Sequence, residues 1–245
     1  MTDKSIGLDR YLQIGWLDLA LRLARENRSV QDARPLLEDR LLEEISGLEA
    51  RKKTITVLNR VWLNPPAYLS QLQQEALDLS LHISPEEHLA LHWGMLQTIY
   101  PFFYTVVSHT GRLLQLQGQT SRIQIRRRVI EEYGERISVE RAVGMALQSL
   151  LHWRVIRESK QIIQADQQIG LSLPVVFWLA RALVLRRDSG MLNFSALTQE
   201  PALFPFSLPP LTARDFESQG FEVLAQAFGG KLLMLTKSRT RPASI

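Results

Sequence analysis

The segment formed by residues 119–171 constrains the fold more than any other part of this chain. Within it, Ser121 precedes an amphipathic run that stops at Gly134, and Ser138 precedes a second run whose apolar residues share one face. Serine is a preferred N-cap of a helix, and glycine commonly follows the last turn. The segment therefore predicts two helices joined by a short turn.

Two short apolar segments follow these helices. They are residues 154–156 and 169–171, and the residues between them are mostly polar. Short apolar runs bounded by polar loops are typical of strands. Two helices followed by two strands around a polar loop is the order of elements in a winged helix-turn-helix, whose second helix enters the major groove of DNA. The segment thus predicts a DNA-binding unit.

The apolar face of the second helix fixes which side chains point away from the core. Arg141 and Gln148 are among them, with Glu140 and Gly144 on the same side. Arginine and glutamine can read guanine and adenine edges, and each good bidentate pair is worth roughly 1–3 kcal/mol of discrimination. The alternative is a winged helix that contacts protein, because the fold alone does not establish DNA binding. Further candidate DNA contacts are Arg122, Arg126 and Arg127 on the first helix, and Arg157 and Lys160 in the expected wing.

A second basic cluster stands at the start of a helix expected over residues 48–63. It comprises Arg51, Lys52 and Lys53, followed by Thr54. Cations near a helix N-terminus interact unfavourably with the helix dipole, so the cluster needs an explanation. One interpretation is a second helix-turn-helix whose first turns meet phosphates and base edges. The other is a solvated face of a bundle helix, and the sequence leaves both open.

Helical periodicity recurs along most of the remaining chain, so we expect a mainly α fold. The exception is the C-terminal part, where residues 221–228 and 231–236 flank Gly229 and Gly230 and predict a β-hairpin. We expect four units: an N-terminal helical unit with a candidate helix-turn-helix (1–64), a helical connector (65–118), the winged helix-turn-helix (119–172), and a small C-terminal α+β portion with a helix and the hairpin (173–245).

Composition narrows the compartment and the partners. The chain has 245 residues and no cysteine, so it has no disulfide and no thiolate metal site, which fits a cytoplasmic protein. The longest apolar stretch, 173–185, contains Arg181 and is too short to span a bilayer, so we expect no membrane partner. A net charge of +4 with a pI near 9.6 favours a polyanionic partner only mildly.

Signals for catalysis or a bound cofactor are weak. His88 and His92 stand four residues apart, a spacing that metal ligands use, but no third ligand is evident. Two residues at the edge of the core are the favoured interpretation. The sequence has no G-x-S-x-G, no P-loop and no G-x-G-x-x-G motif. We therefore expect a non-catalytic protein with no metal and no cofactor, although an enzyme acting on nucleic acid is not excluded.

Three stretches carry a resemblance to a known family: 49–61 (EARKKTITVLNRV), 98–103 (TIYPFF) with 126–129 (RRRV), and 138–141 (SVER) leading to 150–156 (LLHWRVI). By these stretches the chain resembles the BrxA-type proteins of BREX phage-defence systems, over roughly residues 10 to 160. The resemblance implies DNA binding in a bacterial defence island, double-stranded DNA and other defence-system proteins as partners, and no catalytic residues. Residues from about 173 onward form a longer C-terminal portion than the family leads us to expect, and its role stays open.

The sequence thus predicts a DNA-binding accessory subunit of a phage-defence or similar multi-protein system. A winged-helix transcriptional regulator is one alternative, which would need a symmetric operator and normally a dimer. A scaffold that uses the winged helix to hold a protein partner is another.

Overall fold

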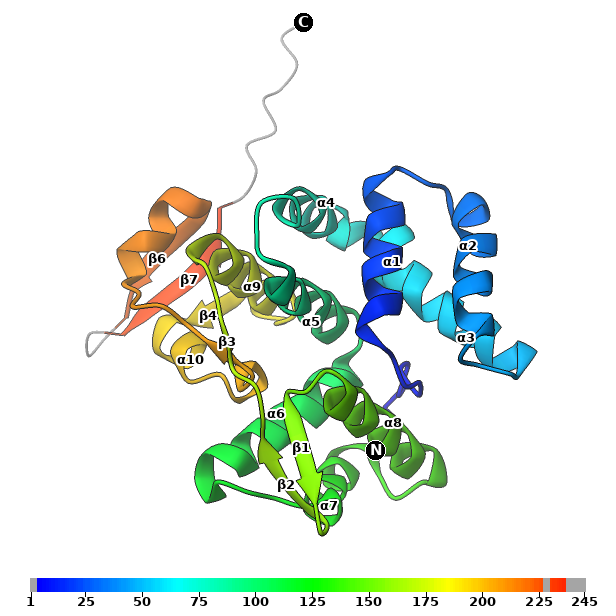
Figure 1. The fold of residues 1–245 in the computed structure, drawn as a ribbon. Coiled ribbons are helices and arrows are strands. Elements are labelled where there is room, and N and C mark those ends of the chain that lie inside the picture. Colours follow the sequence, from blue (N-terminus) through cyan, green and yellow to red (C-terminus); the bar gives the residue numbers. More distant parts are fainter. Residues whose placement is uncertain (1–3, 227–229, 237–245) are drawn as a thin grey trace, which may run out of the picture.

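The computed structural model describes residues 4–226 and 230–236, and the fold is mainly helical with a small sheet near the C-terminus. Helices α1 (Ile14–Arg25), α2 (Val30–Leu42) and α3 (Leu48–Leu58) lie side by side in the N-terminal part (Figure 1). A π-helical turn, η1 (Asn59–Leu63), extends α3. The mainly α fold class and the C-terminal sheet predicted from the sequence are confirmed.

The central helices are apolar on nearly every side. After η2 (Ala67–Leu69), α4 (Ser70–Leu79) and η3 (Pro85–Glu87) comes α5 (His88–Ile99), in which every residue after His88 is buried. A capping box between Ser84 and Glu87 begins this region. Since α5 touches α1, α6 and α9, it is the helix around which the other units pack (Figure 1).

Helices α6 (Pro101–Gln117), α7 (Arg122–Tyr133) and α8 (Ile137–His152) are followed by an antiparallel hairpin of β1 (Ile156–Ser159) and β2 (Ile162–Ala165). Ser121 caps α7 by accepting from the Gln124 N–H, as the sequence predicts. Thr120, just before α7, exchanges two backbone hydrogen bonds of 2.8 and 2.9 Å with Ile163. A short third strand segment between the first two helices of this unit therefore joins the hairpin.

The second strand of the expected wing lies elsewhere. Residues 169–171 do not pair with the first strand; β3 (Ile169–Gly170) pairs in parallel with β5 (Phe206–Ser207). The hairpin closes earlier, at Lys160 and Gln161, whose φ angles are +49° and +67°. Two positive φ values suit the two-residue turn of a hairpin, although glycine and asparagine are the residues that usually adopt them. Because neither residue signals such a turn, the sequence suggested a long polar loop instead.

In the C-terminal part, the buried helix α9 (Leu173–Leu185) packs against a three-stranded sheet whose strand order is β4-β7-β6. Strands β6 (Phe221–Ala225) and β7 (Lys231–Leu235) form the expected antiparallel pair, and Gly229 of the expected turn lies outside the described residues. The region 192–210, between the predicted helix and hairpin, also carries regular structure. It contains most of β4 (Met191–Asn193), α10 (Phe194–Thr198), η4 (Pro201–Leu203) and β5, and η5 (Ala213–Gln219) follows it.

One hydrophobic core joins these parts, with buried residues from Leu8 to Leu233. The tightest junction lies between α6 and η4, where a Cβ added to Gly111 would stand 1.9 Å from the Pro201 carbonyl oxygen. Glycine at this position lets the two backbones meet. Within the described residues, no helix has both the length and the apolar character needed to cross a membrane.

Candidate nucleic-acid interface

The polar face of α8 is open to solvent. Arg141 and Gln148 are exposed, and Glu140 and Gly144 on the same face are partly exposed. A Cβ added to Gly144 would meet nothing within 4 Å. No described element therefore covers the face that the sequence predicts to meet DNA. The helix begins at Ile137, so Ser138 is its second residue and not its N-cap.

The opposite face of α8 is anchored in the core. Val139, Val143 and Leu147 are buried against the neighbouring helices. The Ser149 hydroxyl accepts from the backbone N–H of Leu12 over 2.9 Å. This buried seam fixes the direction in which the polar face points.

The arginines of α7 are all engaged with carboxylates. Arg122 donates from Nε and Nη2 to Glu158 over 2.7–3.0 Å, and Arg126 pairs with Glu140 over 3.1 Å. Arg127 and Arg128 both pair with Glu131, over 3.7 and 3.1 Å. Exposed pairs of this kind contribute about 0–1 kcal/mol, so a phosphate can compete for these arginines. The glutamates reduce the positive charge that the sequence suggests for this helix.

The hairpin β1–β2 places two further cations at the surface. Lys160 occupies the turn, and Arg157 lies on β1, where its guanidinium donates to the Gln164 side chain over 3.2 Å. Both side chains are exposed. Neither pairs with a carboxylate within the described ranges, so both are available to an anionic partner.

The N-terminal basic cluster does not form one surface. Arg51 donates to the carbonyl oxygens of Ile45 and Ser46 over 2.6 and 2.8 Å, so it stabilises the loop before its own helix. These two hydrogen bonds account for a cation near a helix N-terminus, so a contact with DNA is not needed to explain it. Lys52 pairs with Glu49 over 2.8 Å.

Thr54 is 2% exposed, and its hydroxyl donates to the Ala50 carbonyl over 3.0 Å. A DNA contact is not available to a side chain in the core, so the expectation for Thr54 is corrected here. Lys53 is exposed, but it borders a separate cleft and not the face of α8. The structure therefore does not bring the two predicted groups of DNA-binding residues together.

Two exposed isoleucines of this unit were not singled out by the sequence analysis. Ile137, the first residue of α8, is 88% exposed, and Ile123 of α7 is 64% exposed. Ile123 borders a small hollow of about 140 Å³ between α7 and α8. Helical periodicity alone would have placed both residues off the buried faces. Apolar side chains on such a surface can contact thymine methyl groups or a protein partner.

One histidine of the His88 and His92 pair, His92, has a structural role. His92 is fully buried, not at the edge of the core as expected, and its Nδ1 accepts from the Trp62 indole over 3.1 Å. Its Nε2 therefore carries the proton and donates to Asp18 over 2.9 Å. Burial lowers the pKa of His92, which favours the neutral ring. The described residues hold no group of three or more acids, histidines or cysteines suited to a metal ion.

Comparisons with known proteins identified no relative of this chain. A scan against protein-family models and searches of curated proteins and of solved structures found no match to the chain.

Proposed function

We propose that this chain is a non-catalytic, cytoplasmic DNA-binding protein of bacteria that places α8 in the major groove of double-stranded DNA. The observation that carries the proposal is Arg141, an exposed cation on the open face of α8. No carboxylate of the described residues pairs with it, in contrast to the arginines of α7. Gln148 lies two turns further along the same face.

The elements around α8 support the same proposal. Helix α6, the Thr120 strand segment, α7, α8 and the β1–β2 hairpin follow one another in the order of a winged helix-turn-helix. In that motif the second helix reads base edges, and neighbouring elements meet the DNA backbone. Arg157 and Lys160 on the hairpin would contact phosphates, together with Arg127 of α7.

Phosphate contacts would make binding depend on salt. If these three cations each neutralise one phosphate, the logarithm of the association constant falls with that of the salt concentration with a slope of about −2.7. A slope near zero would contradict the proposal.

A gel-shift titration with double-stranded DNA tests the role of α8. Arg141→Ala combined with Gln148→Ala removes two side chains that can each provide roughly 1–3 kcal/mol, so we expect at least about a tenfold weakening. Arg214→Ala is the matched control, because Arg214 is exposed on η5 in the C-terminal part. Unchanged affinity of the double variant would move the contact surface away from α8.

A protein scaffold is the second candidate, and the exposed Ile123 and Ile137 favour it. Both flank the open face, where a partner helix could cover them. Changing both residues to serine would abolish partner capture, because it removes the apolar surface that a partner helix would cover. No detectable duplex binding at low salt, together with loss of the partner in this variant, would decide for the scaffold.

The role in phage defence rests on the resemblance of residues 10–160 to BrxA-type proteins. If the chain is an accessory subunit, deleting its gene should raise the plating efficiency of phage, and the Arg141→Ala and Gln148→Ala variant should not restore protection. Restoration by that variant would separate the biological role from binding of DNA by α8.

A further inference from the structure

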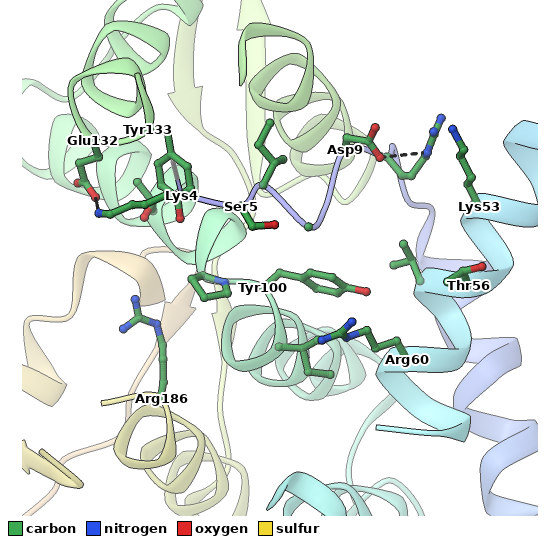
Figure 2. Close-up of a pocket in the computed structure, with 17 residues that line it drawn as sticks. Lys4, Ser5, Asp9, Lys53, Thr56, Arg60, Tyr100, Glu132, Tyr133 and Arg186 are labelled. Carbon is green, nitrogen blue, oxygen red and sulfur yellow. Dashed lines mark ion pairs between the residues drawn. The ribbon is translucent and has the colours of Figure 1, made fainter. Parts of the chain in front are cut away.

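A cleft of about 810 Å³ lies apart from the open face of α8. The N-terminal segment, residues 4–10, crosses one side of it, and α3 with η1 forms another (Figure 2). The remaining walls come from the junction of α5 and α6, the end of α7 and Arg186 after α9. The volume falls in the range of about 300–1,000 Å³ that is common for small-molecule sites.

The lining of this cleft is strongly cationic. Two of its cations are offset by carboxylates, because Arg10 lies 3.2 Å from Asp9 and Lys4 lies 3.9 Å from Glu132. The other three cations form no ion pair with a carboxylate among the residues that the structure describes, and Glu49 and Glu200 act on Lys53 and Arg186 only from a greater distance. They are Lys53, Arg60 and Arg186.

These three cations stand on two opposite walls. Lys53 and Arg60 project from the α3–η1 side, and Arg186 projects from the far side (Figure 2). Unpaired like charges around one cavity repel one another, and an anionic occupant would relieve that repulsion. The separation of the charges calls for an occupant with anionic groups at both ends.

Arg186 is not an ordinary solvated arginine. Its guanidinium carbon lies 3.1 Å from the centre of the Tyr104 ring, and its Nε is buried with no hydrogen-bond partner. The Glu200 carboxylate acts on Arg186 without forming an ion pair with it, so an anion that reaches the guanidinium directly would offset more of the free-energy cost of burying this cation. The stacking on Tyr104 also fixes the plane of the guanidinium, which suits bidentate donation to a phosphate.

Tyr100 supplies a neutral donor beside Arg60. The residue is 4% exposed, its ring lies 5.9 Å from the Arg60 guanidinium, and its hydroxyl points toward the α3–η1 side (Figure 2). No described residue shares a hydrogen bond with that hydroxyl. Burial raises the pKa of Tyr100 to about 12, so the hydroxyl stays protonated and can donate to an anion.

We propose that this cleft binds a small molecule with two or more phosphate groups, one held by Lys53, Arg60 and the Tyr100 hydroxyl and another held by Arg186. A nucleic-acid strand fits less well, because the N-terminal segment crosses the cleft. That segment is tied down at the Lys4 carbonyl, which accepts from Arg136 over 2.9 Å. The proposal does not depend on DNA binding by α8.

Calorimetric titration of the full chain at low salt tests the site, with inorganic pyrophosphate and ATP as probes and inorganic phosphate for comparison. We expect both probes to bind more tightly than phosphate. Lys53→Gln and Arg60→Gln should each weaken the binding of ATP by about tenfold. Lys52→Gln is the matched control on the same helix, because Lys52 pairs with Glu49 and does not line the cleft; it should leave the affinity unchanged.

Arg186→Gln risks unfolding the chain, so Arg186→Lys serves as a second variant, and the thermal unfolding midpoint of each variant is measured with and without ATP. We expect ATP to raise the midpoint of the unaltered chain and to raise that of Arg186→Lys less. Three results would overturn the proposal. They are no binding of either probe at millimolar concentration, an equal loss in Lys52→Gln and Lys53→Gln, and binding of a single-stranded oligonucleotide in place of pyrophosphate and ATP.

Discussion

Trp153 donates its indole N–H to the Leu12 carbonyl over 2.9 Å, although the two residues are 141 positions apart. The backbone N–H of Leu12 in turn donates to the Ser149 hydroxyl, so both backbone groups of Leu12 are bonded to residues at the C-terminal end of α8. We call this pair of hydrogen bonds the Leu12 seam. The seam holds the C-terminal end of α8 against the N-terminal part. The orientation of the open face of α8 thus depends on a residue far from it in the sequence.

Trp153→Phe should destabilise the chain by about 1–3 kcal/mol, because it leaves the buried Leu12 carbonyl without a donor. Urea unfolding monitored by circular dichroism measures the change. Trp62→Phe is a comparison, since it likewise removes an indole donor from a buried acceptor, the Nδ1 atom of His92. A loss below about 0.5 kcal/mol in Trp153→Phe would mean that water replaces the indole.

The pH dependence of stability should report His92. Its pKa in the folded chain lies below the ordinary value of 6.5, chiefly because the ring is buried. The unfolded chain therefore takes up a proton that the folded chain does not. The free energy of unfolding should be highest above pH 6.5 and fall as the pH drops below it, by up to about 1.4 kcal/mol per pH unit.

His92→Gln should remove most of this slope, and His82→Gln, at an exposed position, should keep it. Unfolding titrations in urea between neutral pH and pH 5 provide the measurement. Asp18 and His88 face His92 and must stay unaltered in both variants. An equal slope in the His92→Gln variant would assign the effect to another group.

Two glycine substitutions should act in opposite directions. Gly111→Ala would place a Cβ against the Pro201 carbonyl and should destabilise the chain by about 1–3 kcal/mol or more. Gly144→Ala meets open space within a helix and should stabilise the chain by roughly 1 kcal/mol. Thermal unfolding compares the two.

Gly144→Ala also tests the DNA contact. If the backbone of α8 approaches base edges at Gly144, the added methyl group should weaken duplex binding in spite of the gain in stability. Unchanged affinity would show that the backbone stays farther away.

Removing the negative charge of Glu158 should strengthen DNA binding. Glu158→Gln frees Arg122 from its bidentate pair and removes a charge that repels phosphate. We expect a gain of roughly two- to fivefold at low salt, since surface pairs are worth about 0–1 kcal/mol. Glu222→Gln on β6 carries the same change in net charge as a control. An equal gain in both variants would indicate a general effect of net charge.

Where local chemistry dictates structure, the sequence was a sufficient guide. The N-cap Ser121 binds a backbone group only three residues away, so the start of its helix could be located in advance. The open face of α8 follows from helical periodicity in the same way. Assignments that depend on distant partners were less successful, and the expected wing strand at Ile169 is one example.

The sequence by itself determined the succession of helices, the C-terminal strand pair and the identity of the side chains on the outer face of α8. Only the tertiary structure decided that Ile169 pairs with Phe206, that Arg51 donates to a loop and that Thr54 and His92 are buried. It also decided that Lys53, Arg60 and Arg186 line one cleft. Helical periodicity and caps act over a few residues, so a short window contains them. Strand pairing, burial and charge compensation depend on groups that only folding of the whole chain brings together.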